Sequence, residues 1–124
     1  MGHIKLSPLG HTWLLDIDGT IVKHNGYKDD GQDTLLDGAM AFLRAIPADD
    51  MIIFISSRKE AYRDMTERFL AEQGIRYDHI IFDAPYGERI LMNDRKTSGL
   101  DMAVALNRER DVFEKVEVRI DEDI

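Results

Sequence analysis

The sequence predicts an α/β protein whose sheet is largely parallel and covered on both faces. Apolar segments that lack alternating polar residues, a pattern typical of strands buried on both faces, recur along the chain. Segments of helical periodicity lie between them, which gives the predicted order β, α, β, α, β, β, α, β. No internal repeat or low-complexity tract points to another architecture.

The first half of the chain carries the clearest elements. Residues 12–17 are a short apolar run and are predicted to form a buried strand. Apolar residues recur at i, i+3, i+4 and i+7 over 39–46, which predicts an amphipathic helix that stops at Pro47. The run MIIFI at 51–55 predicts a second buried strand.

The next helix begins with a capping signal. Ser57 and Glu60 have the spacing of a capping box, in which the serine caps the helix and the glutamate reaches back. The helix face carries Ala61, Met65 and Phe69 and is expected to end at Gly74.

In the last third of the chain, the elements are predicted from shorter apolar runs. The runs at 79–82 and 89–92 predict short strands, and 98–107 has the pattern of a helix. Apolar residues alternate over 116–120, as expected for a half-exposed strand.

Composition limits the class of protein. The 124 residues, 44% of them hydrophobic and without a linker-like stretch, predict one domain over 1–124. There is no cysteine and no apolar run long enough to span a membrane, which fits a cytoplasmic protein without disulfides. The net charge of −8 disfavours nucleic acid as a partner, because binding it depends on basic residues.

Polar residues gather where the predicted strands end. Ligands of open α/β sheets bind beyond the carboxyl ends of the strands, and three pairs of polar residues follow strands here: Asp16 and Asp18, Ser56 and Arg58, Asn93 and Asp94. Of two carboxylates one residue apart, one can attack as a nucleophile while the other transfers a proton. With Asp94 they would form an acidic, oxygen-rich site of the kind that Mg²⁺ prefers.

These residues resemble the haloacid dehalogenase superfamily. DIDGT at 16–20 fits the first motif of that superfamily, FISSR at 54–58 the second, and LMNDRK at 91–96 the acidic fourth. The resemblance spans residue 12 to about residue 107, and the fourth motif is similar to that of short bacterial members associated with surface-polysaccharide biosynthesis. It implies a Rossmann-like three-layer sandwich.

The resemblance also implies roles. Asp16 would be the nucleophile and a ligand of Mg²⁺, Asp18 the general acid/base with its carbonyl on the metal, and Asp94 the remaining ligand. Ser56 would bind the phosphoryl group, and the wider substrate-binding set is Gly19, Thr20, Ser56, Ser57, Arg58, Lys59 and Lys96. Ser57 is open to either substrate binding or capping, and Asp16, Asp18 and Asp94 could also simply open turns.

The third motif departs from the superfamily pattern. A lysine or arginine commonly stands before a proline there, whereas this chain has Ala84 before Pro85. Lys59, Arg89 and Lys96 are the candidates for the missing cation, and the sequence does not choose among them.

The sequence therefore predicts a phosphatase without a cap domain. Neither 21–37 nor 59–83 can hold such a domain, so a neighbouring copy in a homo-oligomer is expected to cover the site, with 116–120 or 21–37 at the contact. The expected reaction is Mg²⁺-dependent hydrolysis of a small phosphomonoester, such as a sugar phosphate, through an aspartyl-phosphate. The alternative is a catalytically retired protein that keeps the fold and binds metal, phosphate or a protein; a phosphomutase is disfavoured because it would need a cap.

Overall fold

The computed structural model describes residues 3–124 and has an α/β fold built on parallel strands. Three strands form one sheet in the order β2-β3-β4, and two form a second sheet, β1-β5. Both sheets are parallel, as the sequence predicts. The strands fall into two sheets instead of one, and one face of the three-stranded sheet is open: Leu14, Met51 and Ile81 are 45%, 41% and 49% exposed, so the predicted cover on both faces is not found. In chain order the elements are β1 (His3–Leu6), β2 (Thr12–Asp16), α1 (Gly26–Asp29), α2 (Ala39–Ala45), β3 (Met51–Ile55), the 3-10 helix η1 (Glu60–Tyr62), α3 (Arg63–Glu72), β4 (His79–Ile81) and β5 (Glu117–Ile120).

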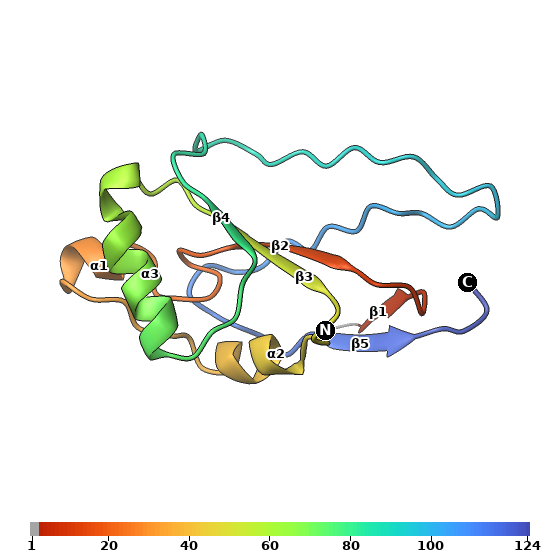
Figure 1. The fold of residues 1–124 in the computed structure, drawn as a ribbon, viewed down its shortest axis with the longest axis horizontal. Coiled ribbons are helices and arrows are strands. Elements are labelled where there is room, and N and C mark those ends of the chain that lie inside the picture. Colours follow the sequence, from red (N-terminus) through yellow and green to blue (C-terminus); the bar gives the residue numbers. More distant parts are fainter. Residues whose placement is uncertain (1–2) are drawn as a thin grey trace.

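The three-stranded sheet brings the ends of its strands to one edge. Asp16, the last residue of β2, is in register with Ile55 at the end of β3, and Ile55 is in register with Ile81 at the end of β4. The segments that follow the strands therefore leave the sheet side by side (Figure 1). This is the edge at which the sequence places its polar pairs.

The hydrophobic core lies directly beneath that edge. Phe54 of β3 is fully buried, and Ile17, the residue after β2, is 2% exposed. Helix α2 contributes Ala39 and Leu43, and α3 contributes Leu70. A packed core on one side of the strand ends fixes the backbone from which the polar side chains project.

The two longer helices fall where the sequence predicts them, but the capping box does not form. Helix α2 ends at Ala45, before Pro47, and α3 ends at Glu72, before Gly74. The second helical segment starts at Glu60, later than expected, and neither N-cap residue, Lys59 or Tyr62, caps it with its side chain. The Glu60 N–H donates instead to the Asp83 carboxylate at 3.2 Å. Glu60 pairs with Arg63 instead of reaching back to Ser57, so the capping prediction is wrong.

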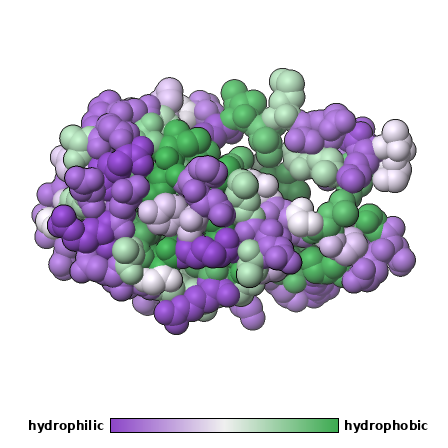
Figure 2. Space-filling model, in the orientation of Figure 1, coloured by the Kyte–Doolittle hydropathy of each residue, from purple (hydrophilic) through white to green (hydrophobic). Residues whose placement is uncertain are grey.

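The segment from 86 to 109, called the arm below, has neither the predicted strand at 89–92 nor the predicted helix at 98–107. It runs outward from the body, reverses near Gly99 and returns (Figure 1). Ile90 is 87% exposed and Met92 is 91% exposed, so the strand predicted at 89–92 lacks a surface to pack on, and the apolar residues of 98–107 are at most half-buried. Short helices and single strands are marginal in water without such packing. Figure 2 shows open space between the outer part of the arm and the body.

The second sheet joins the two ends of the described chain. β5 confirms the strand predicted at 116–120, although all four of its residues are exposed. β1 and the one-turn helix α1 are not in the predicted order of elements. Over residues 3–124, no helix has the length and apolar character needed to cross a membrane.

Candidate active site

Asp16 sits at the end of β2 with both carboxylate oxygens engaged. Thr20 Oγ1 donates a hydrogen bond to Oδ2 at 2.9 Å, and Arg89 Nη1 donates one to Oδ1 at 2.9 Å. The Asp16 side chain remains 36% exposed, so solvent and small ligands reach it. An accessible carboxylate held from two sides is suited to attack on an electrophile.

A tight turn carries the second carboxylate. Asp16 and Asp18 flank the buried Ile17, so their side chains leave the strand on the side opposite the core. Gly19 then adopts φ +82° and donates its N–H to the Val22 carbonyl at 2.7 Å. A residue with a Cβ is strained at that angle, which explains the glycine.

Asp18 is held by a buried arginine. Arg58 donates to its carboxylate from Nε at 3.1 Å and from Nη2 at 3.0 Å. The same guanidinium donates two hydrogen bonds to Asp33, at 3.0 and 2.6 Å, and one to Thr66 Oγ1 at 2.8 Å. These bonds use all five N–H donors of the arginine.

Burial and charge make this cluster rigid. The Arg58 side chain is completely buried, lies 4.0 Å over the Tyr27 ring and is paired with Asp33, which is 1% exposed. Burial alone lowers the pKa of Arg58, but the hydrogen bonds that it donates to Asp18 and Asp33 outweigh burial, so the pKa is raised and the group stays charged. With all five donors used within the protein and its side chain buried, Arg58 holds Asp18 in place and has no donor left for a substrate, which does not favour the substrate-binding role expected from the sequence.

The two serines after β3 lie in different surroundings. Ser56 is 1% exposed, and its Oγ accepts the Arg58 backbone N–H at 2.9 Å. Ser57 accepts a hydrogen bond from Arg89 Nη2 at 3.3 Å, and this places it beside Asp16. The Arg89 guanidinium thus bridges the end of β2 and the segment after β3.

Of the three cations considered for the third motif, Arg89 is the one in contact with Asp16. Lys59 lies 3.9 Å from Asp83 and its side chain is 69% exposed. Lys96 is exposed in the outer part of the arm, where its backbone forms the turn. The structure therefore brings Arg89 to Asp16 and places neither lysine there.

Asp94 is not brought to the other two acids. It lies on the arm, which runs away from the body (Figure 1). Residues 3–124 contain no group of three or more acidic or histidine side chains able to hold a metal ion. The remaining oxygen donors, two residues apart in the sequence, are the Asp16 carboxylate and the Asp18 carbonyl, which accepts no backbone hydrogen bond from the described residues. Mg²⁺ often uses only one or two carboxylates, with water and substrate phosphate completing its shell, so these donors fit such an ion.

Sequence reasoning missed several residues around the site. Asp33 and Thr66 complete the cluster around Arg58. On the other side, the Asp111 N–H donates to the Gly19 carbonyl at 2.8 Å, and the Asp111 carboxylate accepts the His24 N–H at 2.7 Å. In the sequence, Asp33 is an acidic residue in a loop next to a predicted site, which points to it only weakly. No feature of the sequence points to Asp111.

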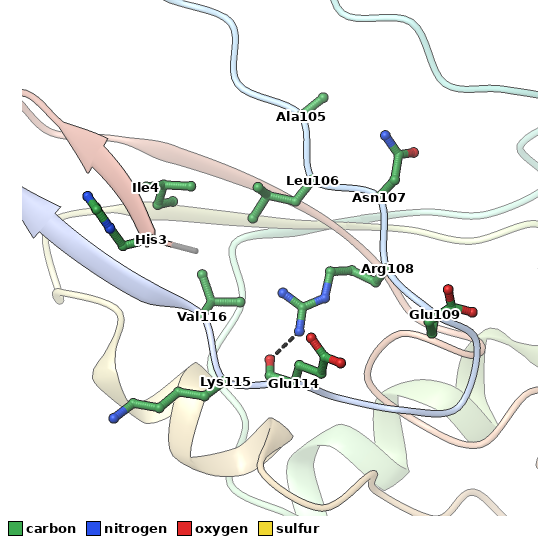
Figure 3. A pocket seen from close by; sticks show the side chains of 10 residues that line it. All are labelled: His3, Ile4, Ala105, Leu106, Asn107, Arg108, Glu109, Glu114, Lys115 and Val116. Atoms are coloured by element: carbon green, nitrogen blue, oxygen red, sulfur yellow. Dashed lines mark hydrogen bonds between the residues drawn. The ribbon is translucent and has the colours of Figure 1, made fainter. Parts of the chain in front are cut away.

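A hollow among the described residues lies away from these acids. It has a volume of about 450 Å³ and lies between the start of β1, the return of the arm and the segment before β5 (Figure 3). Arg108 crosses it to donate to the Glu114 carbonyl. None of the predicted site residues lines it.

Comparison with known proteins gives a likeness to solved structures. No protein-family profile and no curated protein matches the chain. A chain of the structure described as "Structure of Pnkp1/Rnl/Hen1 complex" is 31% identical, with a TM-score of 0.52 over 67% of this chain. A chain of the "Structure of the Pnkp1/Rnl/Hen1 RNA repair complex" is 29% identical, with a TM-score of 0.52 over 71% of this chain. This chain spans only 31% and 30% of those two chains.

Proposed function

We propose that the protein is an Mg²⁺-dependent phosphatase of the haloacid dehalogenase type, with the Rossmann-like three-layer fold of that superfamily. The observation that carries the proposal is the pair of carboxylates after β2, where Asp16 is accessible between two donors and Asp18 is fixed by Arg58. Asp16 attacks the phosphorus of a phosphomonoester, and the bond to the leaving alcohol breaks. Asp18 donates the proton that the alcohol needs and then takes one from the water that hydrolyses the aspartyl-phosphate.

Arg89 supplies the positive charge that the third motif lacks. Its guanidinium contacts both Asp16 and Ser57, where it can stabilise the charge of an incoming phosphoryl group. The absence of a lysine before Pro85 was the main support for a retired, non-catalytic protein. A cation already in contact with the nucleophile weakens that alternative.

Mg²⁺ would be held by the Asp16 carboxylate and the Asp18 carbonyl and would offset charge between nucleophile and phosphate. The matched structures include one described as an RNA repair complex, so phosphorylated nucleotides belong beside sugar phosphates in a substrate screen. Release of phosphate from a chromogenic phosphomonoester in the presence of Mg²⁺ tests the reaction. If no compound in such a screen releases phosphate, the result would favour the alternative of a non-catalytic protein that keeps the fold and binds metal, phosphate or a protein.

Arg89→Ala is expected to lower kcat/KM by roughly 10²- to 10³-fold, the usual cost of removing one donor to a developing oxyanion. Arg89→Lys should recover part of the loss, because it restores charge without the two-pronged geometry. Lys59→Ala and Lys96→Ala are the matched controls, since neither side chain contacts Asp16 or Ser57. Steady-state kinetics on the four variants decide the assignment, and a larger loss at Lys59 or Lys96 than at Arg89 would reverse it.

Mg²⁺ together with inorganic phosphate is expected to raise the melting temperature of the wild type, because both bind the native state only. Asp16→Asn should abolish this response. The same titration on Asp94→Asn compares two arrangements. If Asp94→Asn still shows the rise in melting temperature, the result supports Mg²⁺ bound by the Asp16 carboxylate and the Asp18 carbonyl. If the rise is lost, the result supports the three-carboxylate site expected from the sequence.

A further inference from the structure

The return of the arm places a basic residue on the turn of the candidate site. The ideal Cβ position of Gly19 lies 3.1 Å from Arg110 Cγ and 3.7 Å from its Cδ, so the aliphatic stem of Arg110 packs on this turn. Two hydrogen bonds fix the adjoining backbone there, from the Asp111 N–H to the Gly19 carbonyl and from the His24 N–H to the Asp111 carboxylate. Arg110 thus lies next to the loop that carries both carboxylates.

Arg110 differs from the other two arginines of the site. Arg58 uses all its donors within the protein, and Arg89 is engaged with Asp16 and Ser57. Arg110 is exposed and forms no hydrogen bond or ion pair through its side chain within residues 3–124. A guanidinium in this position is free to bind an anion, and its planar fork suits a phosphate group.

We propose that Arg110 selects substrates that carry a second phosphate, in addition to the one that is removed. The inference rests on the proposed phosphatase activity for its biological meaning, but binding alone can test it. One side of the substrate meets Asp16, Arg89 and Ser57, while the second phosphate meets Arg110 at the rim. Small phosphorylated metabolites with two phosphates fit such a site, as do nucleotides phosphorylated at both ends of the sugar.

The test is equilibrium binding of phosphonates, whose carbon–phosphorus bonds are not hydrolysed. Propylphosphonate is compared with its counterpart that carries a phosphonate at each end, by calorimetry in the presence of Mg²⁺. A charge-assisted contact predicts that the wild type binds the bisphosphonate roughly 10- to 100-fold more tightly. The advantage should shrink at high salt, because the contact is exposed.

Arg110→Met is the informative variant, since it keeps an apolar stem over Gly19 and removes the charge. It should reduce the advantage of the bisphosphonate to about two-fold, the statistical effect of two equivalent ends. Arg110→Lys should keep part of the advantage. Arg108→Ala is the control, because Arg108 lies two residues away, donates to the Glu114 carbonyl and sits over the Phe113 ring.

Equal binding of the two phosphonates by the wild type would overturn the proposal, as would a full advantage in Arg110→Met. Turnover is measured separately on a hexose bisphosphate and a nucleoside bisphosphate, each against its monophosphate, to show which scaffold carries the second phosphate. A bisphosphonate advantage that depends on Arg110, without turnover of these compounds or of the chromogenic phosphomonoester, would support the subsite and count against the phosphatase.

Discussion

Asp16→Asn is expected to abolish phosphatase turnover while leaving the fold intact. The amide that replaces the carboxylate is a very poor nucleophile, so no aspartyl-phosphate forms. Asp18→Asn should instead slow the proton-dependent steps, by about 10²- to 10⁴-fold. The two variants thus separate attack on phosphorus from proton transfer.

The surroundings of Asp16 explain why its replacement should be tolerated. The side chain is 36% exposed, and the ion pair with Arg89 is similarly exposed. Such pairs contribute about 0 to 1 kcal/mol to the free energy of unfolding. Asparagine retains an oxygen that can accept from Thr20, so the melting temperature should stay close to that of the wild type.

Two measurements make this prediction specific. Beryllium fluoride, which mimics an aspartyl-phosphate, should raise the melting temperature of the wild type but not that of Asp16→Asn. Asp30→Asn is the matched control, because Asp30 pairs with Lys23 at 2.8 Å in a loop near the site and has no contact with Asp16. An Asp16→Asn protein with even a tenth of wild-type activity would contradict the assignment of the nucleophile.

The sequence predicts the three-stranded sheet well because its strands carry their own signal. β3 spans the five residues of the run MIIFI, and two of them, Ile52 and Phe54, are at most 1% exposed. A continuous apolar run of this length is stable in the middle of a parallel sheet and in few other places. Two of the three polar pairs, Asp16 with Asp18 and Ser56 with Arg58, follow from the same rule, since parallel strands end at one edge. The third pair, Asn93 and Asp94, does not, because the strand predicted before it does not form.

The arm shows where local pattern fails. RILM at 89–92 is as apolar as many strands, but a strand also needs a neighbour to accept its hydrogen bonds and a surface to cover its side chains. Neither requirement can be read from four residues. The same limit applies to 98–107, whose helical periodicity predicts an amphipathic helix, whereas the segment is extended and only its end lines a hollow beside β1.

The residues missed in the site are long-range partners. Arg58 appears in the sequence as a basic residue after a strand, which favours a phosphate ligand. Its actual role depends on Asp33, which lies 25 residues away in a loop without an identifiable motif. Only the fold brings the two together, and burial then makes their pairing obligatory.

Arg58→Ala is expected to lower the free energy of unfolding by about 3 to 5 kcal/mol, the usual cost of removing one partner from a buried ion pair. Asp33 is 1% exposed and would be left with a buried, uncompensated charge. For a chain of 124 residues this corresponds to a fall in melting temperature of roughly 10 °C or more. Arg119→Ala, which breaks an exposed pair with Glu117, should change it little.

Arg58→Lys separates the positioning role from stability. Lysine restores the charge, but three donors on a single nitrogen cannot replace the two-pronged contacts to Asp18 and Asp33. The variant should therefore regain much of the lost stability and remain slow, with the loss in kcat rather than KM and a changed pH profile. A purely structural Arg58 would instead give a lysine variant whose kcat recovers in step with its melting temperature.

Asp33→Asn, combined with Arg58→Ala, gives a double-mutant cycle that measures the coupling between Arg58 and Asp33. Removing both charges avoids the isolated buried carboxylate, so the double variant Arg58→Ala, Asp33→Asn should be more stable than the sum of the single changes indicates. Thermal unfolding of the four proteins measures the coupling directly, and 0.5 to 3 kcal/mol is the usual range for residues in one network. Additive effects would mean that the contacts between Arg58 and Asp33 contribute little, and Asp18 would then need another explanation for its fixed position.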